Sequence, residues 1–258
     1  MAGVVEALDL IGSQQIQGRC SLAGNLCNAS PAADSVPALF AAGAIAVVVG
    51  SKGRREVPVE QIPTGPGRTS LAKDEFILEF KFPPRPPRSG DAYLRFIPRT
   101  EMDIAVVGCG INVTLDDKGV CTAARVALGA VAPTVLLVPD AATALIGHTL
   151  DADTLAKLDA TARAACKPIN DKRGTIEYRT KVAGVLARRV AAIAFDRAIE
   201  DLLKGKAYDD ALFAAAGKIA SEDCEPVADI HASEEHRRHV LGVLTKRMLK
   251  KAWEQARG

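Results

Sequence analysis

The order of hydrophobic and polar residues predicts helices near the start of the chain. Apolar residues recur at helical spacing over residues 31–42, with Ser30 as the expected N-cap, Pro31 at the first helical position and Gly43 at the end. A further short helix is expected over residues 4–13. The segment between these two helices is rich in Gly, Ser and Asn, and it is expected to form a loop.

Strand patterns follow the second helix. The β-branched run over residues 44–49, a Gly-Ser-Lys-Gly turn and residues 54–59 predict a hairpin. Residues 76–82 show the period of two that is typical of a strand. Residues 83–87 then bring four prolines, which block helical and ladder hydrogen bonds alike. We therefore expect a first domain of mixed helix and strand over residues 1–88.

The pattern changes again beyond the proline-rich segment. Three strands are expected over residues 102–115, 120–128 and 134–138, with turn residues at 116–119. An antiparallel meander is the simplest arrangement of such strands. From Ala141 onward the pattern is helical. The predicted fold class is α+β.

The helical part contains a duplication. Pro168-Ile169-Asn170-Asp171 recurs 58 residues later as Pro226-Val227-Ala228-Asp229 (226 against 168), and Val182-Ala183-Gly184-Val185-Leu186 recurs in the same register as Val240-Leu241-Gly242-Val243-Leu244. Each copy is interpreted as a turn followed by a long helix, in which the Asp caps that helix or bonds a neighbouring backbone amide. We expect a C-terminal domain over residues 89–200 and a second copy of its helical unit over residues 201–258.

Composition narrows the class of protein. The 33 Lys and Arg residues against 31 Asp and Glu leave a formal charge of +2, which gives no electrostatic argument for a nucleic-acid partner. The longest apolar stretches are well short of the roughly 20 residues that a membrane span needs, and the N-terminus lacks the pattern of a signal peptide. We expect a cytoplasmic protein. Its six cysteines form no C-x-x-C pair, so reduced thiols are expected and no metal site is predicted.

Residues 21–35 contain the most informative chemistry. Ala23 and Gly24 allow the backbone to approach a pyrophosphate closely, and Ser21 and Asn25 offer side-chain hydrogen bonds. Free amides at the start of the next helix add positive potential, and a carboxylate at position 34 suits a ribityl or ribose hydroxyl. From the residues alone, the segment is either an anion-binding loop or a structural turn, because Gly-Asn loops before helices are common.

The same segment carries a family resemblance. Ser21-Leu22-Ala23-Gly24-Asn25 resembles the Thr-Ile-Gly-Gly-Asn flavin loop of the FAD-binding medium subunits of molybdenum hydroxylases, the carbon monoxide dehydrogenase and xanthine dehydrogenase family. Residues 64–69, 74–77, 99–105, 128–134 and 171–179 resemble these subunits in the same order, so that the likeness covers residues 4 to about 198.

The resemblance implies roles for particular residues. By it, Ser21, Gly24 and Asn25 hold the phosphates of FAD, and Leu22 and Ala23 belong to the same cofactor-binding loop. The resemblance also implies that Asp34 binds the sugar or ribityl hydroxyls, that Ile77 packs on the flavin and that Arg95 takes the basic position near it. No residue of this chain is expected to act as a catalytic acid, base or nucleophile.

A fold and a function follow from the resemblance. The fold would be the second lobe of a two-lobed FAD-binding domain, followed by a three-stranded antiparallel sheet with packed helices and a duplicated helical tail. The chain would be the electron-transfer subunit of an oxidoreductase complex and inactive alone. A molybdopterin-binding large subunit would oxidise the substrate and a [2Fe-2S] small subunit would relay electrons to the FAD of this chain.

Two alternatives stay open. Family members begin with a further glycine-rich flavin lobe, and no such loop precedes Ser21. The chain could therefore be an assembly or scaffold subunit that has lost FAD binding, or a separate chain could supply the first lobe. Other signals are weak: Gly65-Pro66-Gly67 reads as a loop, and His236, His239 and the basic run 246–251 read as solvated helix faces.

Overall fold

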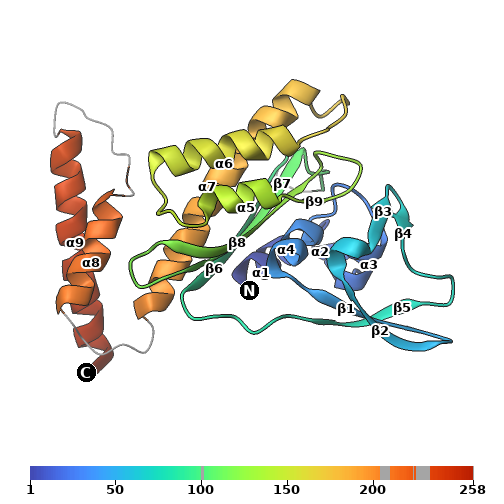
Figure 1. Cartoon of the computed structure of the whole chain (residues 1–258), viewed down its shortest axis with the longest axis horizontal. Helices are drawn as coiled ribbons and strands as arrows, with labels where there is room; N and C mark the ends of the chain where they lie inside the picture. The colour runs from blue at the N-terminus through green and yellow to red at the C-terminus, as the bar shows by residue number, and fades with distance from the viewer. Residues whose placement is uncertain (100–101, 204–209, 223, 225–232, 258) are drawn as a thin grey trace. The chain divides into compact units, whose positions relative to one another are not determined.

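Two antiparallel sheets organise the N-terminal part of the chain in the computed structural model (Figure 1). The structure describes residues 1–99, 102–203, 210–222, 224 and 233–257. The chain divides into two compact units, residues 1–198 and residues 199–258. The predicted α+β class is confirmed, whereas the predicted domain limits at residues 88 and 200 stay predictions.

Short helices and a small sheet form the first half of the first unit, residues 1–198. The helices are α1 (Ala2–Asp9), α2 (Gln14–Gln17), α3 (Leu22–Cys27) and α4 (Ser35–Ala42). The strands β1 (Ile45–Gly50), β2 (Gly53–Pro58) and β5 (Phe76–Lys81) make a sheet in the order β2-β1-β5, and η1 (Val59–Gln61), β3 (Pro63–Gly65) and β4 (Arg68–Thr69) lie between β2 and β5 in the sequence. The predicted hairpin and the predicted strand are confirmed.

Two predictions before and at α4 are wrong: the segment expected to be a loop contains a helix, and the helix expected from Pro31 begins later. The loop contains the helix α3, and α4 begins at Ser35 with Asp34 as its N-cap, not at Pro31. Pro37 explains the late start, because its missing amide is tolerated in the first turn of a helix but not further in. Ser30 instead accepts a hydrogen bond from the Ala32 amide at 3.2 Å in a local turn. The predicted end at Gly43 is confirmed by its left-handed φ of 63°.

The second sheet has four strands in sequential order, not three. They are β6 (Ser89–Phe96), β7 (Val107–Leu115), β8 (Cys121–Gly129) and β9 (Leu136–Leu137), and all pairs are antiparallel. The three predicted strands exist: β7 and β9 are shorter than expected, and β8 is shifted by one residue. The strand β6 was missed because Ser89, Gly90 and Asp91 favour turns, and its pairing with β7 outweighs that local preference.

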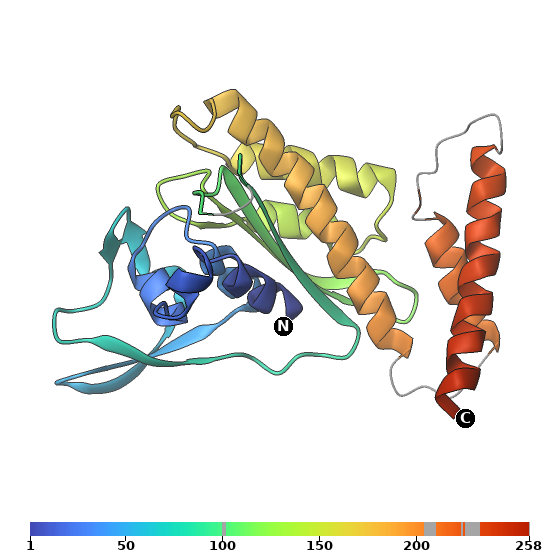
Figure 2. The same cartoon turned by 180° about the vertical axis from the view of Figure 1, so that it is seen from behind.

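Helices cover both faces of this sheet. A Cβ added at Gly110 of β7 would lie 2.7 Å from the carbonyl oxygen of Pro37 in α4, whereas one at Gly90 of β6 would overlap the carbonyl oxygen of Ala194. Gly90 pairs with Val113, an odd number of positions from Gly110, so the two glycines face opposite sides. The helices that follow the sheet are α5 (Pro139–Leu145), α6 (Ala152–Ala165) and α7 (Ile176–Leu203), and Figure 2 shows α7 crossing the sheet.

In the turn before α7, Asp171 takes the second of the two roles expected for it, a hydrogen bond to neighbouring backbone amides. Asp171 accepts hydrogen bonds from the amides of Arg173 (2.8 Å) and Gly174 (3.2 Å). The first amide of α7, that of Ile176, donates instead to Asn170 at 2.6 Å. The Asp of the first copy therefore stabilises its own turn.

The second unit is a pair of helices, α8 (Asp210–Glu222) and α9 (Glu234–Arg257). The helices approach closely where Gly217 and Gly242 meet, since a Cβ on Gly242 would lie 2.9 Å from the Gly217 carbonyl oxygen. The second copy of the Pro-x-x-Asp turn, residues 226–229, lies outside the described residues. In the described parts of the chain, no helix is long and apolar enough to cross a bilayer.

Candidate functional site

Asp34 and Arg95 form a buried ion pair between α4 and β6. Nη1 of Arg95 donates to Oδ2 of Asp34 at 2.8 Å, and the phenol of Tyr93 donates to Oδ1 at 3.3 Å. Tyr93 and Arg95 are two residues apart on β6, so both side chains point to the face that α4 covers. Asp34 and Arg95 were expected from the family resemblance, but Tyr93 was not. Tyr93 could have been found from the alternation of side chains along β6, but that strand was not predicted.

Burial sets the electrostatics of this cluster. Loss of water raises the pKa of the Asp34 carboxyl, although the neighbouring guanidinium of Arg95 and the Tyr93 hydroxyl oppose the rise. The pKa of Tyr93 is raised well above its usual range, also mainly by burial. Nε of Arg95 is buried and has no hydrogen-bond partner. A buried donor without a partner destabilises the fold, so a hydrogen-bond acceptor of a ligand near this atom would stabilise it.

Asn25 connects α3 to the start of α4. Its Oδ1 accepts hydrogen bonds from the hydroxyl (2.7 Å) and the amide (3.3 Å) of Ser35. The first amide of α4 is therefore not free, contrary to the expectation of open amides at this helix start. The side-chain nitrogen of Asn25, Nδ2, donates to no residue that the structure describes. It stays available to an acceptor beside Asp34, the neighbour of Ser35.

The other residues of the predicted flavin loop belong to α3. Ser21 is its N-cap and accepts a hydrogen bond from the Gly24 amide at 3.0 Å. Leu22 packs partly against the hydrophobic core, whereas Ser21 and Gly24 are exposed and Ala23 is half-buried. A Cβ added at Gly24 would meet only the Ser21 hydroxyl, at 3.0 Å. The predicted loop is thus a capped helical turn with one open side.

Ile77 lies apart from this network. It is half-buried on β5, pairs with Val48 of β1 and packs against the hydrophobic core. The structure brings Asn25, Asp34 and Arg95 together through Ser35 and places residues 21–24 on the same short helix as Asn25. It does not bring Ile77 into direct contact with the Asp34 and Arg95 pair.

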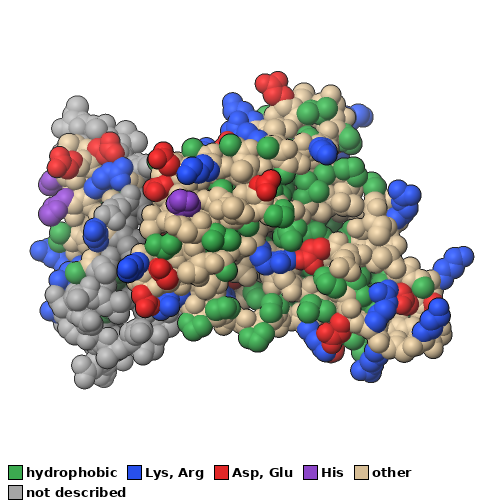
Figure 3. All heavy atoms as spheres, viewed as in Figure 1, with side chains coloured by type: hydrophobic (Ala, Val, Ile, Leu, Met, Phe, Trp, Pro, Cys, Tyr) green, Lys and Arg blue, Asp and Glu red, His purple; other side chains and the backbone are tan. Residues whose placement is uncertain are grey.

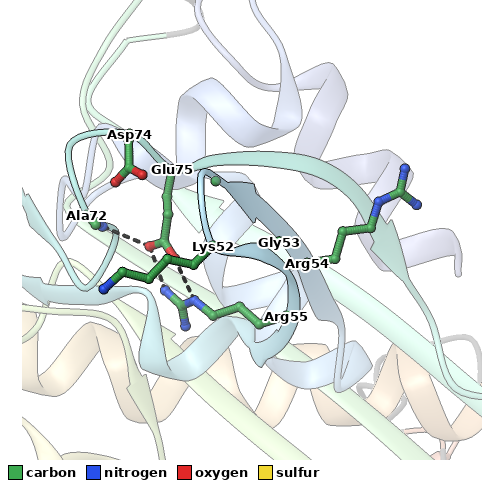
Figure 4. A pocket seen from close by; sticks show the side chains of 8 residues that line it. Lys52, Gly53, Arg54, Arg55, Ala72, Asp74 and Glu75 are labelled. Atoms are coloured by element: carbon green, nitrogen blue, oxygen red, sulfur yellow. Dashed lines mark hydrogen bonds and ion pairs between the residues drawn. The ribbon is translucent and has the colours of Figure 1, made fainter.

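A small surface pocket of about 120 Å³ lies at the β1–β2 turn, away from the predicted site (Figure 4). Glu75 accepts two hydrogen bonds from Arg55, both at 2.8 Å, and one from the Ala72 amide at 2.8 Å. The hydrogen bond from Arg55 is the main reason that the pKa of Glu75 falls to about 2. These charges satisfy one another, so the arrangement holds the hairpin against the start of β5.

A larger cleft of about 340 Å³ lies beside the residues that precede Asp34. Most of its lining is apolar and comes from the segments 30–32, 104–105 and 130–133, with the basic side chains of Lys167, Arg173 and Arg179 among its polar lining residues. None of the eight predicted residues lines this cleft or the small pocket. The sequence pattern does not predict this cleft, because its lining residues come from segments that are far apart in the sequence.

Charge and metal ligands add little to this picture. On the face of the first unit seen in Figure 3, acidic and basic side chains are intermixed, with hydrophobic side chains between them. The residues that the structure describes contain no group of three or more His, Cys, Asp or Glu side chains placed to hold a metal ion. All six cysteines are free thiols.

Comparison with known protein families identifies the class to which this α+β chain belongs. The family model described as the FAD binding domain in molybdopterin dehydrogenase matches residues 1–85. The model described as the CO dehydrogenase flavoprotein C-terminal domain matches residues 92–194 and again residues 191–252. The chain therefore belongs to the family of FAD-binding subunits of molybdopterin dehydrogenases, and the resemblance seen in its sequence is confirmed.

Individual relatives agree. The chain is 30% identical to the xanthine dehydrogenase FAD-binding subunit of Escherichia coli O157:H7 over 71% of its own length and 63% of that protein. It is 33% identical to the carbon monoxide dehydrogenase medium chain of Afipia carboxidovorans over 73% of its own length and 65% of that protein. The match thus spans less than two thirds of these two relatives.

Solved structures show the same likeness. A carbon monoxide dehydrogenase structure from Hydrogenophaga pseudoflava superposes with a TM-score of 0.73 at 30% identity, over 76% of this chain and 68% of that chain. The quinoline 2-oxidoreductase of Pseudomonas putida 86 superposes with a TM-score of 0.68 at 26% identity, over 75% of this chain and 66% of that chain.

The residues present fit a flavin dinucleotide in two respects. Two side-chain groups, the buried Nε of Arg95 and Nδ2 of Asn25, have no partner among the described residues and are donors for phosphate or carbonyl oxygens. The Asp34 carboxylate, with one hydrogen bond at each oxygen, keeps lone pairs for a hydroxyl group. These three groups belong to one connected network.

Proposed function

We propose that this chain binds FAD and transfers electrons within a molybdenum hydroxylase-type oxidoreductase complex. The observation that carries the proposal is the network of Asn25, Asp34 and Arg95, with donors left unpaired, in a chain of this family. The partners would be a molybdopterin-binding large subunit and a [2Fe-2S] small subunit. The electrons would leave the flavin for an acceptor.

The protein's share of this function is to bind and orient. Asn25 and the exposed Gly24 would approach the phosphates, with Ser21 fixing the first turn of α3. Asp34, held by Arg95 and Tyr93, would accept hydrogen bonds from ribityl or sugar hydroxyls. Arg95 would place a fixed positive charge near the isoalloxazine, and Ile77 would give an apolar contact. When bound, FAD supplies the redox chemistry, which no side chain of this chain provides.

The test is the visible absorbance of the purified chain, alone and co-purified with its partner subunits, followed by release of FAD on denaturation. Bound FAD near one per chain is expected in the complex. Asn25→Ala and Asp34→Asn should lower the FAD content, whereas Asp153→Asn, which changes an exposed carboxylate on α6, should leave it unchanged. Colourless protein in the complex with excess FAD would rule the proposal out.

One observation favours a second candidate, a scaffold subunit without flavin. The charges of Asp34 and Arg95 already compensate each other, so neither buried charge needs a ligand as its partner. In a scaffold, Asp34→Asn would change the stability of the fold but not the visible spectrum of the complex. Measuring both properties on one preparation separates the two candidates.

A further inference from the structure

The second unit repeats the helix pair of the first unit at one fixed offset. The helix α9 begins 58 residues after α7 (234 against 176), and the described part of α8, from residue 210, falls 58 residues after the start of α6 at residue 152. The caps repeat as well: Thr175 accepts from the Tyr178 amide at 3.1 Å, and Ser233 accepts from the His236 amide at 3.2 Å. The second match of the C-terminal family model, over residues 191–252, covers the same helices.

The contact between the helices repeats too. A Cβ on Gly184 of α7 would meet Asp159 and Arg163 of α6. Its counterpart, Gly242 of α9, would meet Gly217 and Ser221 of α8, and each of these is 58 positions beyond its equivalent. The two pairs therefore pack through the same positions.

The repeats differ in what covers the long helix. In α7, Ala183, Leu186 and Val190 are 0%, 6% and 0% exposed. This face lies on the four-stranded sheet, because Arg179 at one end donates to the carbonyl beside β7 and Ala194 at the other end meets β6. The described residues of the second unit include no strand.

Within the second unit, no described residue covers the equivalent face of α9. Leu241, Leu244 and Met248 are 38%, 48% and 60% exposed, and they replace residues that the sheet buries in α7. Glu234 and Lys251 are exposed at the two ends of this stripe. The spacings of three, four and three from residue 241 to residue 251 are those of a heptad seam, in which two helices pack side by side. Arg237 occupies the seam position between Glu234 and Leu241.

Charge selects the occupant of the seam. In an antiparallel pair with a two-fold axis between residues 242 and 243, Leu241 of one copy faces Leu244 of the other, and Glu234 faces Lys251. The same axis places Arg237 opposite Met248, over which the aliphatic stem of the arginine can pack with its charged end in water. Of the two carboxylate oxygens of Glu234, Oε1 accepts the hydrogen bonds from Arg238, which leaves Oε2 for the lysine. A parallel pair would instead place like charges together at both ends.

We propose that α9 is a dimerisation helix, whose seam of Leu241, Leu244 and Met248 packs antiparallel against the same seam of a second copy of this chain. A second α9 thus takes the place that the sheet holds on α7. The pairing involves none of the flavin-binding candidates, so it stands or falls independently of the proposed function.

The test is the molar mass of the full chain in solution, measured by light scattering or sedimentation over about a hundredfold concentration range. The wild type should be a dimer that dissociates on dilution. Leu244→Glu should raise the dissociation constant about tenfold or more, because burying a leucine contributes roughly that much. His239→Glu, an equal change on an exposed residue of the same helix outside the seam, should leave it unchanged.

A charge exchange tests the antiparallel register. Lys251→Glu should weaken the dimer, and Glu234→Lys combined with Lys251→Glu should restore it, with helicity checked by circular dichroism. If Leu244→Glu misfolds, the charge exchange still tests the dimer. A wild type that is monomeric over the whole concentration range overturns the proposal. That outcome is also expected if the stripe packs against another part of the same chain. A dimer that tolerates Leu244→Glu or ignores the charge exchange overturns it as well.

Discussion

Arg179 and Asp171 are joined by two hydrogen bonds of 2.7 Å, from Nη2 of the arginine to each oxygen of the carboxylate. Nη1 of the same guanidinium donates to the carbonyl oxygens of Val106 (2.8 Å) and Ala130 (3.3 Å), which lie next to β7 and β8. One buried side chain, only 5% exposed, therefore fixes the first turns of α7, the preceding turn and the end of the sheet together.

Arg179→Met should destabilise the first unit by about 2 to 4 kcal/mol, because it strands two buried carbonyls and a carboxylate. The control is Arg173→Met, which removes a more exposed arginine from an ion pair with Asp103 and should cost less than about 1 kcal/mol. Urea unfolding followed by circular dichroism measures both. Equal effects of the two substitutions would contradict the structural role given to Arg179.

Gly90→Ala should destabilise the contact between β6 and α7 by about 1 to 3 kcal/mol or more, because the added methyl overlaps backbone that cannot move aside. Gly18→Ala is the matched control. Its added Cβ would meet nothing closer than 3.7 Å and its φ of −63° suits alanine, so its effect should stay within about 0.5 kcal/mol. Thermal unfolding of both variants checks the difference.

Glu75 should titrate far below an ordinary glutamate. Its pKa is lowered from 4.5 to about 2, chiefly by the hydrogen bonds from Arg55. A carboxyl whose pKa is depressed on folding favours the folded state above its unfolded pKa, and this contribution is lost as the pH falls through the folded value. The loss is therefore expected between pH 4.5 and about 2.

The measurement for Glu75 is a carboxyl NMR titration of the wild type and of Arg55→Met. The variant should return the pKa of Glu75 toward 4.5. Lys52→Met removes the smallest of the charge effects that lower the pKa of Glu75 and should shift this pKa much less. An unchanged pKa in Arg55→Met would show that the hydrogen bonds do not hold in solution.

Tyr93→Phe should raise the pKa of Asp34 further above its ordinary value, because the phenol hydrogen bond opposes the effect of burial. The free energy of unfolding at neutral pH should fall by about 1 kcal/mol, since the bond of 3.3 Å is long. Tyr178→Phe, which changes a tyrosine that is 43% exposed, is the control. A pKa of Asp34 that does not move would refute the contact.

Local pattern was enough to predict the hairpin of β1 and β2, the strand β5 and the end of α4 at Gly43. These elements have strong signals of their own, such as the β-branched run in β1 and the glycine at positive φ. The start of α4 was not predictable from the favourable Pro31, because Pro37 limits how far the helix can extend backwards. Two prolines competed for the same role, and pattern alone did not rank them.

The site shows the same division. Family resemblance pointed to Asn25, Asp34 and Arg95, and the structure connects them, but nothing local in the sequence indicated that Arg95 would reach Asp34 across 61 positions. Tyr93 escaped notice because its strand begins with residues that favour turns. The cleft of 340 Å³ escaped because five separate segments meet there.

The close approach at Gly90 and Gly110 also bears on how this fold can diverge. A side chain at Gly90 would displace α7 from the sheet, and one at Gly110 would displace α4. A substitution at either position is therefore tolerated only if the helix that contacts it shifts away from the sheet. Homologous sequences should therefore either keep glycine at these two positions or show covariation between them and the helix residues beside Ala194 and Pro37. The sheet thus constrains mutation from both of its faces at once.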